Sequence, residues 1–422
     1  MNVPTSRSSS SLSSGRRQGK GAEALGRSPW ILAVVLATIA TGNLVLTSAL
    51  QDVLPVDYLL VCMAVCGLVG LYRLKAAGRR ATALIPLGLF LAGSAIGVLS
   101  SSNSPYALNK YVTFAMICLV AAAIATLKDQ SRLSRPLMIC LLVVGTASSA
   151  LLLAFGAPTM TGRFSLFELN PIGLARATGL SLVIASSLLI ATPRTKWRLD
   201  AVSLWMIIGT LGLVATVSTG SRGPLLSSVV ALVCVAAVTF RSKGPGVVSL
   251  LLLVAFVAAG YRAVLSFGGT GLDRLESGVE SGRTDLYAQT WNIISEQPIL
   301  GIGWGNFPLY IFDYASDDGT LYPHNILLEI WMEGGLLSLL GFIALSTFAL
   351  VRAYRASRDS SWALVTLAIL VYSLMNALFS SDVVGNRLMW VLLVVGLLSE
   401  SAKAPRGGKK LRGPRVHLAT TQ

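Results

Sequence analysis

The sequence predicts an all-α polytopic membrane protein with about twelve transmembrane helices and one large, partly helical loop late in the chain. The mean hydropathy is +0.69 and only 13% of residues are charged, whereas a soluble domain is closer to a quarter charged. Apolar stretches approach the length that crosses a bilayer, and the basic residues alternate between the connections that join them. These observations indicate one integral membrane domain rather than several soluble ones.

The apolar stretches are nearly unbroken runs of Ala, Leu, Val and Ile. A helix of about 20 residues spans the hydrocarbon core of a bilayer. The tenth stretch also fits an interfacial turn followed by a span, and the last is short for a full crossing. The predicted spans are 30–49, 54–72, 82–100, 110–127, 136–156, 172–192, 200–218, 223–241, 246–266, 326–351, 362–380 and 386–400.

Most of the 34 Lys and Arg residues lie in the two termini and in every second connection between predicted spans. Basic residues favour the cytoplasmic side of a membrane, so the alternation predicts that both termini are cytoplasmic. The net charge of +15 is then a topology signal that also suits anionic membrane lipids, and no nucleic-acid partner is expected. The basic connections include Arg73, Lys75, Arg79, Arg80, Lys128, Arg132, Arg135, Arg194, Lys196, Arg198, Arg241, Lys243, Arg352, Arg355 and Arg358.

The domain organisation follows from these patterns. Residues 1–28 are Ser-rich and basic and are expected to form a disordered cytoplasmic tail. The membrane domain is predicted over 29–400, with a catalytic loop over 268–323 on the outer side, and a second basic cytoplasmic tail over 401–422. All five cysteines lie inside predicted spans, where they suit packing rather than a disulfide framework or a metal site.

Two helix starts on the predicted outer side have features of phosphate-binding sites. In the first, Ser221 can cap a helix whose free N–H groups lie beside the guanidinium of Arg222. The second is the Asn170-Pro171 helix start, with Arg163 before it and Arg176 about one turn inside the span. The alternative is an ordinary pair of turns whose arginines reach lipid phosphate or neighbouring carboxylates.

The outer loop is the one long polar interval of the sequence. Its spacing of apolar residues predicts an amphipathic helix over 283–297, beginning at Arg283 and lying on the membrane face. The glycines of the GIGWGNF segment over 301–307 predict a sharp return. An acidic stretch over 313–318 is more typical of a solvated turn than of a metal site.

His324 is the only histidine outside the C-terminal tail, and imidazole is well suited to moving a proton near neutral pH. Together with Asn325 it is predicted to start a helix that also carries Glu329 and Glu333. His324 and Gly335 then share one helix face, and the pair Gly334-Gly335 lets another helix or a lipid come close. A structural role for the histidine is the alternative.

The motifs of these segments resemble the O-antigen ligase / O-antigen polymerase family of bacterial inner-membrane glycosyltransferases, which are related to the GT-C class. The spacing from His324 to Gly335 matches the ligase pattern, whereas Arg283 is followed by Leu286 one residue too early. That departure favours a polymerase over a ligase without weakening the family. The matching segments are STGSRGPLL over 218–226, Arg283 to Phe307 with its GIGWGNF turn, and His324-Asn325 to Leu336.

The resemblance implies a glycan donor on undecaprenyl pyrophosphate, presented at the periplasmic face of the inner membrane, and no metal or cofactor. It implies that Arg222 and Arg283 hold the pyrophosphate, and that His324 activates a sugar hydroxyl of the acceptor, as catalytic residues. The donor is already activated, so direct displacement with inversion is expected. Further substrate contacts are expected from Arg163, Arg176, Ser221, Asn325, Glu329 and Glu333.

Three functions stay open on these grounds. The first is a ligase that transfers the glycan to lipid A–core, and the second is a polymerase of O-antigen or exopolysaccharide repeat units. The third is an anion transporter, which would carry polar residues or broken helices near the membrane midplane. The mid-span residues are mostly apolar, which favours an enzyme.

Overall fold

The computed structural model describes most of the chain, and its fold is all-α apart from one short hairpin. The hairpin pairs β1 (Ala157–Pro158) with β2 (Phe164–Ser165) in antiparallel fashion. The predicted tails and the predicted ninth span at 246–266 lie outside the described residues. The structure describes residues 29–45, 57–72, 81–102, 104–127, 131–159, 163–166, 169–192, 198–243, 283–311 and 321–399.

Within these ranges, eight helices are long and apolar enough to cross a membrane, and three apolar helices are shorter. They confirm an all-α, multi-pass membrane protein, and their bounds match the predicted spans closely. The long ones are η2 (Ala81–Leu84) with α4 (Ile85–Leu99), α5 (Pro105–Ala125), α6 (Ser131–Phe155), α7 (Pro171–Ala191), α8 (Leu199–Ser218), α9 (Arg222–Lys243), α14 (Ile326–Ser357) and α15 (Ser361–Phe379). The shorter ones are α2 (Pro29–Val45), α3 (Tyr58–Tyr72) and α16 (Arg387–Leu398).

Several helices begin where the sequence places a capping side chain followed by proline. Ser104 accepts a hydrogen bond from the backbone N–H of Ala107 at the start of α5, and Pro105 follows it. The Asn170 side chain caps α7 in the same way before Pro171. Such caps satisfy N–H groups that have no partner inside the helix, and proline loses nothing at the first helical position.

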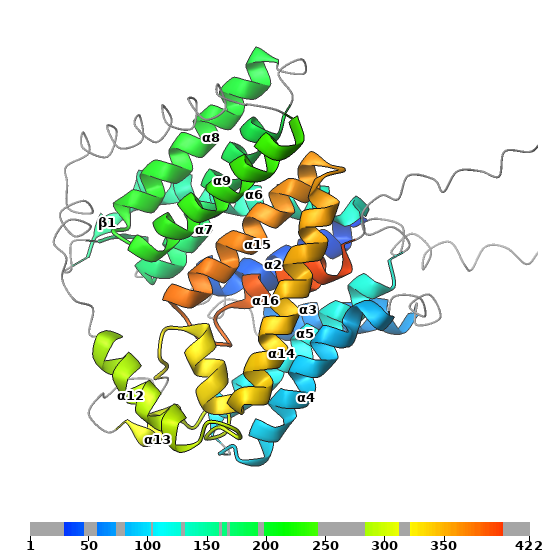
Figure 1. The fold of residues 1–422 in the computed structure, drawn as a ribbon. Coiled ribbons are helices and arrows are strands. Elements are labelled where there is room, and N and C mark those ends of the chain that lie inside the picture. Colours follow the sequence, from blue (N-terminus) through cyan, green and yellow to red (C-terminus); the bar gives the residue numbers. More distant parts are fainter. Residues whose placement is uncertain are drawn as a thin grey trace, which may run out of the picture.

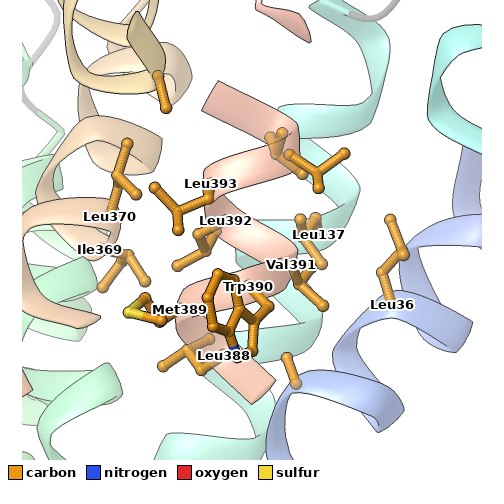
Figure 2. Packing of buried hydrophobic residues seen from close by; sticks show 14 of the residues in the cluster. Leu36, Leu137, Ile369, Leu370, Leu388, Met389, Trp390, Val391, Leu392 and Leu393 are labelled. Carbon is orange, nitrogen blue, oxygen red and sulfur yellow. The ribbon is translucent and has the colours of Figure 1, made fainter. Parts of the chain in front are cut away.

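The centre of the molecule is α16, which is buried on every side from Leu388 to Leu398. Figure 2 shows it surrounded by Leu36 of α2, Leu137 of α6, and Ile369 and Leu370 of α15. A helix that is apolar all round belongs in an interior. With 12 residues it is about 18 Å long, so it is shorter than a full crossing of about 30 Å.

The other helices form two groups around α16 (Figure 1). On one side α7 packs against α6, α8, α9 and α15, and on the other α14 packs along α4 while α5 packs against α3. Helix α12 (Arg283–Glu296) and the single turn α13 (Phe307–Tyr310) lie beside the end of the bundle at which α14 begins.

The basic and non-basic connections that alternate along the sequence lie at different ends of the helical bundle. At one end of the bundle, the connection before α5 contacts the turn before α13, where Ser102 donates to Asn306. At the other end, the guanidinium of Arg135 lies 5.8 Å from the ring of Trp362, and Arg352 donates to the carbonyl of Ser399. The connections predicted to be non-basic and basic therefore lie at opposite ends. Which end faces the cytoplasm stays a prediction.

Candidate functional site

Helix α14 is broken at Gly335, where the backbone adopts φ 75° and ψ −179°. This conformation is open to glycine and strained for residues with a Cβ. A Cβ at Gly335 would also meet the carbonyl oxygen of Ile299 at 2.2 Å. The break separates a first half-helix, residues 326–334, from the longer remainder of α14. A close approach at this glycine is present, but the approaching segment is the turn after α12 rather than the predicted helix or lipid.

That turn, residues 298–307, fills the break with backbone hydrogen bonds. At the end of the first half-helix, Ile302 N donates to the carbonyl of Met332 at 2.8 Å and Gly303 N donates to that of Glu333 at 3.0 Å. At the start of the second half, Leu336 N donates to the carbonyl of Pro298 at 3.1 Å. Non-helical backbone is tolerated inside a membrane protein only where its polar groups are satisfied in this way.

The glycines of the turn make the sharp return that the sequence predicted. Gly301, Gly303 and Gly305 have φ values of 72°, 92° and 79°, a region that favours glycine. Each also lies against another backbone, since a Cβ at Gly303 would meet the carbonyl oxygen of Ser100 at 2.4 Å. The glycines of the motif are thus explained by backbone packing.

Trp304 and Asn306 connect the same turn to α4 and to its C-terminal end through side-chain hydrogen bonds. Trp304 is fully buried and its Nε1 donates to the carbonyl of Ser94 at 2.9 Å. Asn306 donates through Nδ2 to the carbonyl of Ser100 at 2.9 Å. A buried tryptophan contributes a large apolar area and still needs a partner for its N–H, and the carbonyl of the buried Ser94 in α4 supplies one.

A buried cluster of charges lies behind the turn. The ammonium of Lys110, in the second turn of α5, contacts Glu329 at 2.7 Å and also Glu333. All three side chains are fully buried. The backbone N–H of Val383 donates to both carboxylate oxygens of Glu329, at 3.1 and 3.0 Å. The cluster therefore joins α5, the first half of α14 and the connection before α16.

Asp382 extends the cluster. Its Oδ2 accepts from the hydroxyl of Tyr106 at 2.9 Å, and its Oδ1 accepts from the backbone N–H of Gly385 at 2.7 Å. The Lys110 ammonium lies 4.4 Å from the centroid of the Tyr106 ring, which is within the range of a cation–π contact.

Lys110 is the first residue of the predicted span 110–127, and the sequence alone did not reveal its partners. The signal that identifies the cluster is the pair Glu329 and Glu333, because positions four apart on a helix share a face. Two carboxylates on one face of a buried helix need a cation from a neighbouring helix. Their predicted contact with substrate stays a prediction, and the structure shows both directed at Lys110.

His324 lies before α14 rather than within it, which corrects the predicted helix start. The helix begins at Ile326, and Asn325 is its cap, accepting from the N–H groups of Leu327 and Leu328 at 3.0 and 3.3 Å. His324 itself has φ 56°, so it does not share a helix face with Gly335. Its ring is half-buried and lies 4.4 Å from that of Tyr322.

The predicted arginines fall at separate places around this end of the bundle. Arg222 is the exposed first residue of α9, and the Oγ of the buried Ser221 lies 3.5 Å from the carbonyl of Pro171. The two predicted phosphate-binding helix starts are therefore adjacent. Arg283 is the first residue of α12, and its side chain lies outside the described part of the structure.

Arg176 and Arg163 take part in local structure. The guanidinium of the buried Arg176 donates to the carbonyls of Asn376 at 3.1 Å and Ser380, where a cation suits the C-terminal end of α15. It also lines a narrow hollow together with Asn376 and Asn386. Arg163 pairs through its backbone with Thr159 in the hairpin.

In the described part of the chain, no three His, Cys, Asp or Glu side chains lie close enough together to hold a metal ion. Near this end of the bundle lie the imidazole of His324, the exposed Arg222 at the start of α9, and the start of α7. Such groups suit an anionic ligand and a proton transfer.

Comparisons with known proteins point in the same direction. Residues 207–343 match the model of a family described as O-antigen ligase. The chain is also 27% identical over 146 residues to the teichuronic acid biosynthesis protein TuaE of Bacillus subtilis. The aligned residues make up 32% of this chain. The match spans 30% of the length of that relative. Residues 207–343 are therefore similar to the O-antigen ligase family, and the resemblance predicted from the motifs is confirmed.

Proposed function

We propose that this chain transfers a glycan from undecaprenyl pyrophosphate to a sugar hydroxyl at the periplasmic face of the inner membrane. In this proposal it acts as an O-antigen ligase-like, metal-independent glycosyltransferase whose acceptor is lipid A–core. The observation that carries the proposal is the family match over 207–343, because it includes Arg222, Arg283 and His324.

The proposed chemistry divides between donor and acceptor. Arg222 and Arg283 bind the diphosphate and offset the charge that grows as the anomeric C–O bond breaks. His324 accepts the proton of the attacking hydroxyl, and the product is inverted at the anomeric carbon. The place of Arg222 at the exposed first turn of α9 supports this role, because helix N–H groups and a guanidinium together favour phosphate.

The remaining polar residues have supporting roles in the proposal. Ser221 and Arg163 lie near the helix starts that face the donor, and Asn325 fixes the helix that follows His324. Arg176 is proposed to reach the donor only through the hollow that it lines with Asn386. Membrane lipids surround the bundle and carry the polyprenyl chain of the donor.

A polymerase of O-antigen or exopolysaccharide repeat units is the second candidate. The relative that matches part of the chain is named for teichuronic acid biosynthesis. Its name refers to a polysaccharide and not to lipid A–core, which favours this second candidate. The acceptor decides between the two candidates. Purified protein offered both a lipid A–core acceptor and a second lipid-linked repeat unit would distinguish them by the product formed.

The proposed site requires the end of the bundle that carries α12 to be periplasmic. In a cysteine-free background, Asp285→Cys on the exposed face of α12 should react with a membrane-impermeant maleimide in intact cells. Ser360→Cys, at the cap of α15 on the opposite end, should react only after the cells are opened. The reverse pattern would place the site in the cytoplasm and exclude the proposed function.

The arginines give the direct test of donor binding. Arg222→Ala and Arg283→Ala should each lower transfer by roughly a hundredfold, about 3 kcal/mol, because each removes charge stabilisation from the breaking bond. Lysine should restore little of it, since an ammonium does not reproduce the planar fork of a guanidinium. The assay is transfer from lipid-linked glycan by purified protein.

Arg198→Ala is the matched control for this test. Arg198 is exposed at the opposite end of the bundle and pairs with Asp200, so its loss should leave transfer unchanged. A normal rate in Arg283→Ala would make that residue structural and would remove the donor site from the start of α12.

A further inference from the structure

The charges of the buried cluster do not balance. Among the described residues, Lys110 is the one cation in contact with Glu329 and Glu333, and Asp382 accepts from the hydroxyl of Tyr106 close by. Asp382 has donors on both oxygens, from Tyr106 and from the N–H of Gly385. Lys110 therefore faces two carboxyl groups where one would neutralise it.

The two glutamates differ in the partners of their oxygens. Both oxygens of Glu329 accept the N–H of Val383, and Oε1 also accepts from Lys110. Glu333 accepts from Lys110 through Oε2 only. Its Oε1 is buried and meets no hydrogen-bond partner among the described residues.

An ionised carboxylate is poorly placed in this position. Burying a charge without compensating donors costs far more than burying an unpaired hydroxyl, and two adjacent carboxylates favour protonation of one of them. Among the described residues, the ionisable groups that share this cluster with Glu333 are Lys110 and Tyr106 from α5, Glu329 from its own helix, and Asp382 from the connection before α16. The packed turn 298–307 contributes none.

We propose that the Glu329–Glu333 pair is a proton-binding site, and that Glu333 carries the proton. Lys110 and Glu329 then form a neutral ion pair, and Glu333 accepts from Lys110 as an uncharged acid. This inference concerns the free protein and does not depend on the glycan transfer proposed above.

The proton-binding site lies beside the break in α14. Glu333 is two residues before the break at Gly335, and its carbonyl accepts from Gly303 in the turn that fills the break. Loss of the proton at high pH would put an uncompensated charge at this junction. The junction holds the half-helix that follows His324, so we expect the protonated pair to keep that half-helix in place.

The effect on stability has a definite sign. The folded protein holds a proton that an exposed glutamate of the unfolded chain would have lost at neutral pH. Folding then takes up a proton, so stability falls as pH rises. The melting temperature of the purified full-length protein in detergent should therefore fall as the pH is raised from acid to alkaline.

Two measurements on the same protein test the proposal. Infrared spectra in H₂O and D₂O should show the carbonyl stretch of a protonated carboxylic acid at neutral pH, and Glu333→Gln should remove it. Glu333→Gln mimics the uncharged acid without the cost of taking up a proton, so its melting temperature at neutral pH should be at least that of the wild type and should no longer fall at high pH. Glu296→Gln, on the exposed end of α12, should change neither result.

The comparison with Glu329 identifies the residue that holds the proton. Glu329→Gln removes the ionised partner of Lys110 and should lower the melting temperature at neutral pH, whereas Glu333→Gln should not. The proposal is wrong if the wild-type spectrum lacks the acid band. It is also wrong if Glu333→Gln melts as low as Glu329→Gln.

Discussion

Replacement of His324 by Asn is expected to leave only trace glycan transfer. Asparagine tolerates the left-handed backbone that His324 adopts, and it forms hydrogen bonds but does not accept a proton from a hydroxyl. General-base catalysis contributes roughly a hundred- to ten-thousandfold, and the loss should be of that size. The measurement is the rate of transfer from lipid-linked glycan by the purified variant.

The other histidine of the chain provides the control. His417 lies in the C-terminal tail, and His417→Asn should transfer glycan normally. Binding of the lipid-linked glycan should survive in His324→Asn, because the arginines are proposed to hold the donor. A normal rate in His324→Asn would remove His324 from the mechanism. Loss of donor binding together with transfer would make it a ligand of the pyrophosphate.

Lys110→Met is expected to destabilise the protein by about 3–5 kcal/mol, because breaking a buried ion pair leaves a charge without compensation. Methionine is unbranched and only one heavy atom shorter than lysine, so the loss is mainly electrostatic. Thermal unfolding of the purified variant, read together with its yield in the membrane, measures the effect. Arg198→Met breaks the exposed pair with Asp200 and should cost no more than about 1 kcal/mol.

Double variants show which glutamate Lys110 neutralises. Lys110→Met with Glu329→Gln removes both members of the ion pair and should recover much of the lost stability. Lys110→Met with Glu333→Gln should recover little, because Glu333 is proposed to be uncharged already. Equal recovery in the two double variants would mean that the lysine is shared evenly between the glutamates, since residues in contact show coupling of this kind.

The spans were predictable because each depends on a local property of the sequence. Apolar length sets the helices, and Ser104 and Asn170 mark two helix starts through capping groups that are visible in the sequence. The break of α14 was less visible. A Gly-Gly pair inside an apolar run indicates that another group comes close to the helix. It does not reveal that a turn more than 30 residues earlier forms hydrogen bonds with the backbone on both sides of a break in the helix.

The sequence indicated which residues belong to the candidate site, but it did not indicate how they are arranged in space. The motifs identified His324 and the arginines, whereas the position of His324 outside the helix depends on a single backbone conformation at residue 324. Lys110 was missed because its partners lie more than 200 residues away in the chain. Charges that pair across such distances leave no periodic pattern in either segment.

The insertion of residues 298–307 into the break of α14 determines which parts of the protein move together. The turn is bonded to both halves of α14 and to α4, so the half-helix 326–334 does not swing about Gly335 unless the turn leaves with it. Because the turn is also bonded to α4 and to the second half of α14, any displacement of the half-helix must break hydrogen bonds of the turn. Changes of length within 298–307 or 326–334 are therefore expected to disturb three helical segments at once.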